Sequence, residues 1–201
     1  MFQISIKKNE NRPEIISQIV DFLRDGAMMV LPTDTIYGFS CRADDDKTIK
    51  RIYKAKQRSA RKPFIILVSS LAMAKKYVHI SKKNELILKK YWYLDKRPTT
   101  VILNHRGLLP ESLTGGQAGL ALRLPKSDFL IKIIKKINTP LVSTSLNISG
   151  KESLNQLSEL SLIWPSKSKQ PDLVVNSGKP RSLRPSRLID LRGLVVNILR
   201  K

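Results

Sequence analysis

Apolar residues recur along the chain at two spacings, one typical of helices and one typical of strands. In the stretch 13–26, PEIISQIVDFLRDG, they recur every three or four positions between a proline near the start and a closing glycine, which predicts a helix. The apolar run AMMVL at 27–31 follows at once and predicts a short buried strand. Residues 126–137 repeat the helical spacing, so a second amphipathic helix is expected there.

Further short apolar runs alternate with helical patterns over the rest of the chain. Helices are expected from the aspartates at 44–46 to about residue 56, and over 70–77 and 81–92. Strands are expected at 64–68, 99–103, 119–124 and 140–144, and in the tail at 172–176, 187–191 and 194–199. Short strands separated by helices predict an α/β fold with a partly parallel sheet. No low-complexity linker interrupts the pattern, which favours a single domain over residues 1–201.

The composition agrees with a globular protein and argues against two other classes. With 41% apolar and 26% charged residues, the chain is too apolar to be disordered. Its longest apolar runs are too short to span a bilayer, and the N-terminal MFQISIKKNE lacks the apolar core of a signal peptide. The single cysteine, Cys41, has no partner for an internal disulfide. We therefore expect a cytoplasmic protein without membrane association, in which Cys41 is a small buried apolar residue.

Positive charge is the one unusual property of the composition, and it is concentrated in one quarter of the chain. The formal net charge is +21, and residues 51–100 hold 14 basic but only 2 acidic side chains. Such basicity favours a polyanionic partner, either nucleic acid or the phosphates of a nucleotide. Paired lysines such as Lys75–Lys76 and Lys82–Lys83 equally fit the solvated outer faces of helices, and the sequence leaves this alternative open.

The chemistry that the sequence lacks narrows the functions that it can support. Neither His79 nor His105 lies in a nucleophile motif, and no glycine-rich phosphate loop or paired carboxylate is present. The hydroxyl, amide and cationic side chains that remain collect in LPTDTIYG at 31–38, around Arg123, and in STSLNISG at 143–150. Each segment follows a predicted strand, and ligands of open α/β sheets gather at the carboxyl ends of strands. Such groups suit a reaction whose substrates supply the nucleophile while the protein positions them.

Four segments, in this order and spacing, resemble the YrdC/TsaC family of threonylcarbamoyl-adenylate synthases: LPTDTIYG, KQR followed by KP, LALRLP, and STSLNISG. The resemblance covers nearly the whole chain and is to the short, single-domain form of the family. It implies a twisted mixed α/β sheet with flanking helices and a basic concave face. It also implies a nucleotidyltransferase that joins L-threonine, bicarbonate and ATP into threonylcarbamoyl-AMP and pyrophosphate, with Mg²⁺ bridging phosphate oxygens.

The family's product is an intermediate in the synthesis of N6-threonylcarbamoyladenosine in tRNA. The resemblance therefore implies a downstream threonylcarbamoyl transferase complex as a partner, and tRNA as a further candidate. A rival interpretation is a non-catalytic RNA-binding or ribosome-associated protein that uses the same basic concave surface. Only 6% of the residues are aromatic, and a pure binder needs no such ordered set of motifs, so the synthase is preferred.

The resemblance also assigns roles to individual side chains. It implies an L-threonine site formed by Thr33, Thr35, Arg123, Ser143 and Ser186, with Tyr37 shaping the same pocket. It implies Lys56 and Arg58 as catalytic residues, and a nucleotide site formed by Lys56, Arg58, Lys62, Ser145, Asn147 and Arg200. Arg123 stands between two leucines, and a charge inside an apolar strand needs a partner. Asp34 is interpreted as structural.

Each of these motifs has a purely structural alternative when it is taken alone. Thr33 and Thr35 are also typical turn residues, Lys56 and Arg58 also suit the end of a solvated helix, and 143–147 also suits a turn or helix cap. The chain departs from the family at residues 95–98, where DKRP replaces a Trp-Pro-Gly-Pro turn. That replacement adds two cations close to the predicted site.

Overall fold

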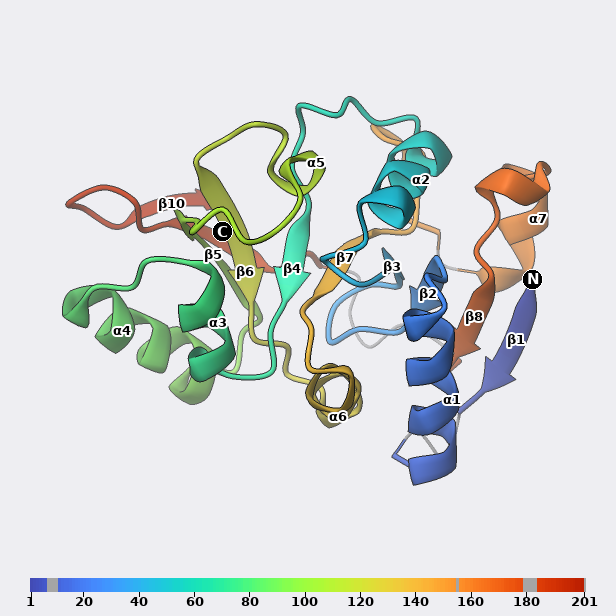
Figure 1. Cartoon of the computed structure of the whole chain (residues 1–201), viewed down its shortest axis with the longest axis horizontal. Coiled ribbons are helices and arrows are strands. Elements are labelled where there is room, and N and C mark those ends of the chain that lie inside the picture. The colour runs from blue at the N-terminus through green and yellow to red at the C-terminus, as the bar shows by residue number, and fades with distance from the viewer. Residues whose placement is uncertain (7–10, 155, 179–183, 201) are drawn as a thin grey trace.

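The strands of the protein form one mixed sheet whose order differs from the order of the strands in the sequence. A computed structural model describes residues 1–6, 11–154, 156–178 and 184–200 of the chain. Within this part the strands form a ten-stranded sheet in the order β1-β8-β2-β3-β7-β4-β6-β5-β9-β10. Figure 1 shows β1 and β10 at opposite ends of this sheet. The strands are β1 (Phe2–Ser5), β2 (Met29–Leu31), β3 (Gly38–Ser40), β4 (Ile65–Leu67), β5 (Thr99–Asn104), β6 (Gly119–Arg123), β7 (Leu141–Ser145), β8 (Leu173–Asn176), β9 (Arg187–Asp190) and β10 (Asn197–Arg200).

The longer helices begin and end close to the positions that the sequence pattern predicts. The helices are α1 (Pro13–Arg24), α2 (Asp46–Lys56), α3 (Leu71–Tyr77), α4 (Lys82–Lys89), α5 (Glu111–Thr114), α6 (Asp128–Ile137) and α7 (Leu160–Ile163). A π-helical turn, Lys90–Leu94, extends α4, and short 3₁₀ turns occupy Leu157–Glu159 and Lys167–Lys169. The sequence pattern missed β1, β3 and the four-residue helices α5 and α7, because such short elements carry too few residues to show a period.

Helix α2 shows how local sequence sets the ends of an element. The side chain of Asp45 accepts a hydrogen bond of 3.0 Å from the amide of Thr48, which confirms the run of aspartates as a helix start. Gln57 takes a left-handed conformation, with φ of 48°, and ends the helix directly after Lys56. Helix α6 follows the same rule, since Ser127 caps its start and Asn138 ends it with φ of 55°.

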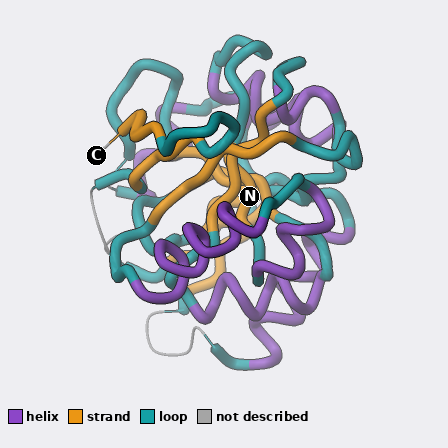
Figure 2. Tube along the Cα trace, turned by 90° about the vertical axis from the view of Figure 1, so that its left-hand side faces the viewer, coloured by secondary structure: helices purple, strands orange, loops and turns teal. Residues whose placement is uncertain are grey.

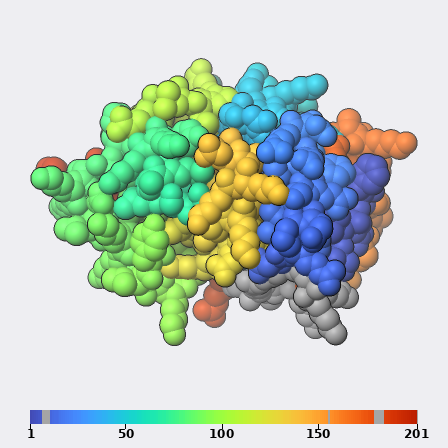
Figure 3. All heavy atoms as spheres, turned by 60° about the horizontal axis from the view of Figure 1, so that its bottom comes forward, coloured from blue at the N-terminus to red at the C-terminus, as the bar shows by residue number. Residues whose placement is uncertain are grey.

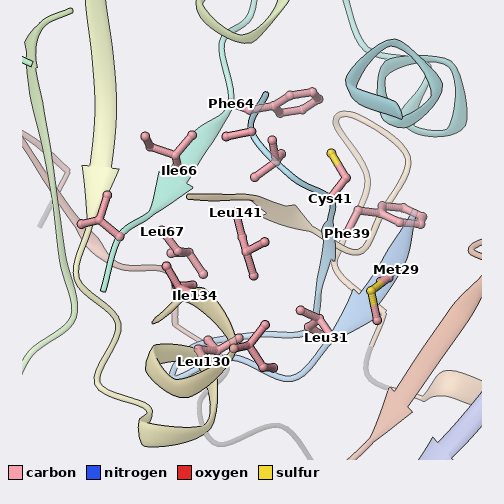
Figure 4. Packing of buried hydrophobic residues seen from close by; sticks show 14 of the residues in the cluster. Met29, Leu31, Phe39, Cys41, Phe64, Ile66, Leu67, Leu130, Ile134 and Leu141 are labelled. Carbon is pink, nitrogen blue, oxygen red and sulfur yellow. The ribbon is translucent and has the colours of Figure 1, made fainter. Parts of the chain in front are cut away.

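The helices cover a continuous apolar core. Figure 2 shows the strands as a twisted layer with helices packed against it, and Figure 3 shows the α6 region between α1 and the α3–α4 region. In Figure 4, Leu130 and Ile134 of α6 point toward Leu67 and Leu141 of the neighbouring strands β4 and β7. All four side chains are fully buried. Cys41 is buried in the same core with no disulfide, as the sequence predicted.

Strand direction corrects one expectation about the site. β7 runs antiparallel to β4, and β4 runs parallel to β6, so β6 and β7 run in opposite directions. The carboxyl ends of β6 and β7 therefore lie at opposite edges of the sheet, and Arg123 does not reach the 143–150 segment through a shared carboxyl edge. The prediction failed because the direction of neighbouring strands depends on pairing between segments that are distant in sequence.

Candidate functional site

One pocket brings together most of the side chains that the sequence marked as functional. It has a volume of about 310 Å³ and opens between the β2–β3 loop, the segment after α2, the sheet and the C-terminal strands. Its lining residues are Thr35, Ile36, Tyr37, Gly38, Arg58, Pro63, Phe64, Ile65, Arg123, Ser143, Thr144, Ser145, Ser153, Pro185, Ser186 and Arg200.

The strand register explains how residues from three strands reach one wall of this pocket. Ile65 pairs with Ser143 on one side and with Ala121 on the other. Alternate residues of a strand point to the same face, so Arg123 lies on the face of Ile65 and Ser143. The site is thus built on a face of the sheet as well as on the loops that border it.

The β2–β3 loop presents a hydroxyl that is held in place by a second hydroxyl. The Oγ1 atoms of Thr33 and Thr35 are 2.9 Å apart, and Thr33 Oγ1 also donates to the carbonyl of Ile36 at 2.7 Å. The amide of Thr35 donates back to Thr33 Oγ1 at 3.0 Å. Thr33 therefore braces the loop without lining the pocket, whereas Thr35 lines it.

Arg123 is a buried cation at the wall of the pocket. Its Nη1 donates to Thr35 Oγ1 at 3.2 Å, and its Nη2 lies 3.2 Å from Asp34 Oδ1. The contact with Asp34 is a close ion pair without hydrogen-bond alignment, and Arg123 Nε has no hydrogen-bond partner among the described residues. Burial lowers the pKa of the Arg123 guanidinium, and the negative charge of Asp34 opposes that shift.

Arg58 is a second cation that lines the pocket, and it is half-buried. Its Nε donates to the carbonyl of Lys62 at 3.1 Å and its Nη2 to the carbonyl of Pro63 at 3.0 Å. The guanidinium also stacks over the ring of Phe64, 5.3 Å from its centre. Burial lowers the pKa of Arg58. Lys62 contributes its carbonyl to this arrangement, but it is absent from the pocket lining.

Lys56 lies behind the pocket wall. Its Nζ donates to the carbonyl of Ser145, to the carbonyl of Asn147 at 3.0 Å and to Asn147 Oδ1 at 2.7 Å. Ser145 Oγ donates to the same Asn147 Oδ1 at 2.6 Å. Burial, with a smaller contribution from Arg58, lowers the pKa of Lys56 to about 7. The structure thus brings Lys56, Ser145 and Asn147 together as the sequence suggested, but of the three only Ser145 lines the pocket.

The C-terminal part of the chain closes the pocket. Ser186 Oγ and Thr100 Oγ1 are 2.8 Å apart, and Arg200 donates from Nε to the carbonyl of Ser186 at 2.9 Å. Burial lowers the pKa of Arg200. Both Ser186 and Arg200 line the pocket, so a strand at the far end of the sheet order contributes a cation to it.

Several lining residues carried no signal that sequence reasoning could use. Ser153 and Pro185 are common residue types outside the ordered motifs, and only the tertiary structure places them in the pocket. Ile36 lies inside LPTDTIYG, but as an apolar residue it was not marked as functional. Phe64 precedes a strand and its ring stacks on Tyr53, 4.1 Å away between ring centres, which makes it a platform for Arg58. The cations Lys96 and Arg97 of the DKRP segment do not line the pocket.

Three cations, Arg58, Arg123 and Arg200, line the pocket, and no carboxylate side chain does so among the described residues. In the same part of the chain, no group of three His, Cys, Asp or Glu residues could hold a metal ion. A magnesium ion is normally held by one or two protein carboxylates together with substrate phosphates, and the pocket lacks the former. The lining therefore does not fit a protein-held Mg²⁺, whereas it suits ligands that carry carboxylate or phosphate groups.

The fold and the pocket define a mixed α/β protein with a cationic, hydroxyl-rich site for small anionic molecules. Comparison with known proteins gives the family. The model of the Sua5/YciO/YrdC family, described as telomere recombination, matches residues 21–201. The chain belongs to the Sua5/YciO/YrdC family, which confirms the resemblance seen in the sequence.

The relatives include named enzymes. A threonylcarbamoyl-AMP synthase of Pyrococcus abyssi is 30% identical over 171 residues, which are 85% of this chain and 48% of that relative. A putative threonylcarbamoyl-AMP synthase of Methanocaldococcus jannaschii is 29% identical over 191 residues, covering 92% of this chain and 86% of that relative. The chain thus spans about half the length of the first relative and most of the second.

A solved structure agrees with the fold. The crystal structure of P. abyssi Sua5 complexed with L-threonine superposes with a TM-score of 0.83 at 26% identity, over 99% of this chain and 56% of that one. This match confirms the predicted mixed α/β sheet with flanking helices. Separately, no helix within the described ranges combines the length and the apolar character that a membrane crossing requires.

Proposed function

We propose that the protein is a threonylcarbamoyl-AMP synthase, a nucleotidyltransferase that converts L-threonine, bicarbonate and ATP into threonylcarbamoyl-AMP and pyrophosphate. The observation that carries this proposal is that one pocket holds both the Arg123–Thr35 contact and the Arg58 guanidinium. The first arrangement suits an amino acid and the second a polyphosphate. Family membership and a solved relative complexed with L-threonine support the proposal.

The threonine half of the proposed site uses Arg123 and hydroxyl groups. The guanidinium offers planar donors to the carboxylate of the amino acid, and Thr35 offers a hydroxyl beside it. Ser143 and Ser186 complete the walls around the amine and the side chain. Thr33 acts on this half by bracing Thr35, and Tyr37 by lining the pocket while its hydroxyl lies 2.9 Å from Ser177 Oγ.

The phosphate half of the proposed site uses Arg58 and Arg200, together with the hydroxyl of Ser145. The threonine amine and bicarbonate form an N-carboxy carbamate with loss of water, and an oxygen of the carbamate attacks the α-phosphorus of ATP as pyrophosphate leaves. The attacking group and the triphosphate are both anionic, so cations that hold them together lower the barrier. No protein nucleophile is needed, which agrees with the absence of a nucleophile motif in the sequence.

The proposal assigns different roles to Lys56, Asn147 and Lys62. Lys56 holds the backbone carbonyls of Ser145 and Asn147, so we assign it first to shaping the loop that meets the nucleotide. Its direct contact with phosphate stays a prediction, as do the nucleotide contacts of Asn147 and Lys62. We treat Mg²⁺ as a companion of the ATP substrate and route no step through it.

The wider role is the first step of N6-threonylcarbamoyladenosine synthesis in tRNA, carried out by a single cytoplasmic domain. In that role the intermediate passes to a threonylcarbamoyl transferase complex, and the charge of +21 provides affinity for tRNA. The rival, a non-catalytic RNA-binding protein, accounts for the charge but not for a pocket that carries Thr35, Arg123 and Arg58.

Pyrophosphate release from ATP tests the proposal. We expect release that depends on both L-threonine and bicarbonate, measured with a coupled phosphate assay. The threonine analogue lacking the hydroxyl, 2-aminobutyrate, serves as the matched control substrate and should react poorly. Release that is unchanged without threonine, or no release under any condition, would reject the synthase in favour of the binding protein.

A further inference from the structure

Asp34 contacts Arg123, a residue of the pocket wall, without itself lining the pocket. Its carboxylate faces Arg123, and only 3% of its side chain and 5% of the Arg123 side chain are exposed. We propose that Asp34 is a positioning residue that holds the buried Arg123 guanidinium toward the pocket and thereby sets the affinity for the amino-acid substrate. This inference rests on the proposed function, because it concerns the same site.

The first reason to assign this role to Asp34 is that its negative charge compensates the buried positive charge of Arg123. A guanidinium that is removed from water needs an opposite charge nearby, because desolvation of an unpaired ion is strongly unfavourable. Among the described residues, Asp34 is the acidic side chain that forms an ion pair with Arg123. Burial lowers the pKa of Arg123 and Asp34 raises it, so the carboxylate favours the charged form that a substrate carboxylate would recognise.

The two carboxylate oxygens of Asp34 have separate partners. Oδ2 accepts a hydrogen bond of 2.9 Å from the amide of Lys126, which ties the β2–β3 loop to the segment before α6. Oδ1 lies 3.2 Å from Arg123 Nη2 and has no other partner among the described residues. One oxygen therefore anchors the loop, while the other faces the guanidinium.

The contacts of Arg123 show which of its guanidinium nitrogens are already held by protein groups. Nη2 faces Asp34, Nη1 donates to Thr35, and Nε is buried without a hydrogen-bond partner in the described part of the chain. The guanidinium is thus held at two nitrogens while it lines the pocket. Without the Asp34 charge, only the Thr35 contact at Nη1 remains among these contacts to orient Arg123.

The variant Asp34→Asn separates the charge from the anchor. The amide oxygen of an asparagine can still accept from the Lys126 amide, whereas its NH₂ group would face Arg123 Nη2 and place two donors against each other. We expect the KM for L-threonine to rise at least tenfold, with kcat at saturating threonine and the KM for ATP within about twofold of wild type. Calorimetric titration with L-threonine should show the same loss of affinity.

Asp172→Asn is the matched control. Asp172 also accepts from a backbone amide, that of Met28 at 2.8 Å, and also pairs with an arginine, Arg51, at 2.6 Å and 2.9 Å. Neither Asp172 nor Arg51 lines the pocket. We expect this variant to keep the wild-type KM for threonine, so an effect confined to Asp34→Asn reports the site and not the loss of any aspartate–arginine pair.

These experiments distinguish failure of the proposed role of Asp34 from failure of the proposed synthase function. If wild-type protein releases pyrophosphate in a threonine-dependent manner and Asp34→Asn has an unchanged KM for threonine, the role of Asp34 is rejected while the synthase stands. An equal rise in the KM for ATP, or a fall in kcat alone, also rejects it. Should Asp34→Asn fail to fold, Asp34→Glu keeps the charge and moves it by one methylene. A raised threonine KM with an unchanged ATP KM then supports the inference, and an unchanged threonine KM overturns it.

Discussion

The ammonium of Lys56, the last residue of α2, donates hydrogen bonds to both the backbone carbonyl and the side-chain carbonyl of Asn147, at 3.0 Å and 2.7 Å. Ninety-one positions separate the two residues in the sequence. The contact joins the helix to the loop after β7, whose Ser145 lines the pocket. Lys56 therefore stabilises the site from behind, and its titration is coupled to folding.

The stability of the protein relative to Lys56→Met should depend on pH. Burial lowers the pKa of Lys56 from 10.5 to about 7, so between these values the unfolded chain binds more protons than the folded chain. The free energy of unfolding of the wild type, relative to Lys56→Met, should therefore rise between about pH 7 and pH 10, by at most about 1.4 kcal/mol per pH unit. Urea unfolding of both proteins at several pH values measures it. A difference that is flat or falls with pH would contradict the assignment.

Arg58→Ala should abolish most pyrophosphate release. Arg58 lines the pocket, and its guanidinium is fixed by the carbonyls of Lys62 and Pro63. Loss of a preorganised charge at developing phosphate charge typically costs about 100- to 1,000-fold in rate. Steady-state kinetics with varied ATP should show this loss in kcat/KM. Arg61→Ala is the control, because Arg61 is an exposed cation of the same segment outside the pocket, and it should retain wild-type activity.

Thr35→Val should weaken threonine binding while leaving ATP binding intact. Valine has nearly the shape of threonine but leaves Arg123 Nη1 without its hydroxyl acceptor. An unsatisfied buried donor costs about 1–3 kcal/mol, which corresponds to roughly a tenfold or greater rise in the KM for threonine. Thr114→Val removes a hydroxyl that donates to the carbonyl of Glu111 away from the pocket, and its threonine KM should not change. Equal effects of the two substitutions on threonine KM would argue against a role for the Thr35 hydroxyl.

Gly38→Ala should destabilise the fold beside the pocket. A Cβ atom on Gly38 would lie 2.7 Å from the carbonyl oxygen of Thr144, a backbone atom of the paired strand β7. The two strands must separate to relieve this overlap, at a cost of about 1–3 kcal/mol. Thermal unfolding checks this expectation. Gly193→Ala, whose Cβ would meet nothing closer than 4.0 Å, should melt within about 2 °C of wild type.

Local pattern predicted most of the elements, and it did so for identifiable reasons. The apolar stripes of α1 and α6 and the aspartates before α2 are helix signals that depend only on residues close in sequence. They could therefore be recognised without a structure. The motifs that contain the threonine, arginine and serine residues of the site could also be recognised, because their order along the chain resembles that of the family. Thr35, Arg58, Arg123, Ser143, Ser145, Ser186 and Arg200 indeed line one pocket.

The remaining features depend on contacts between distant segments. Lys56 and Lys62 belong to the same basic segment as Arg58, yet of the three only Arg58 lines the pocket. The Lys56 ammonium is instead held by the carbonyls of Ser145 and Asn147, and Lys62 is exposed. The sequence predicted a structural role for Asp34, but only the tertiary structure, in which the β2–β3 loop meets β6, shows its pairing with Arg123 across 89 positions. No periodic pattern in the sequence predicts this contact between the β2–β3 loop and β6.

The sequence by itself determined the family, the α/β class and the set of chemical groups available, since these follow from local composition, spacing and motif order. The tertiary structure alone decided the order and direction of the strands, and with them the face on which Ile65, Ser143 and Arg123 converge. It also decided which cations face the pocket and which are held by carbonyl oxygens behind it. The physical reason is that register and burial are set by pairing between segments far apart in the chain, and a local pattern carries no information about that pairing.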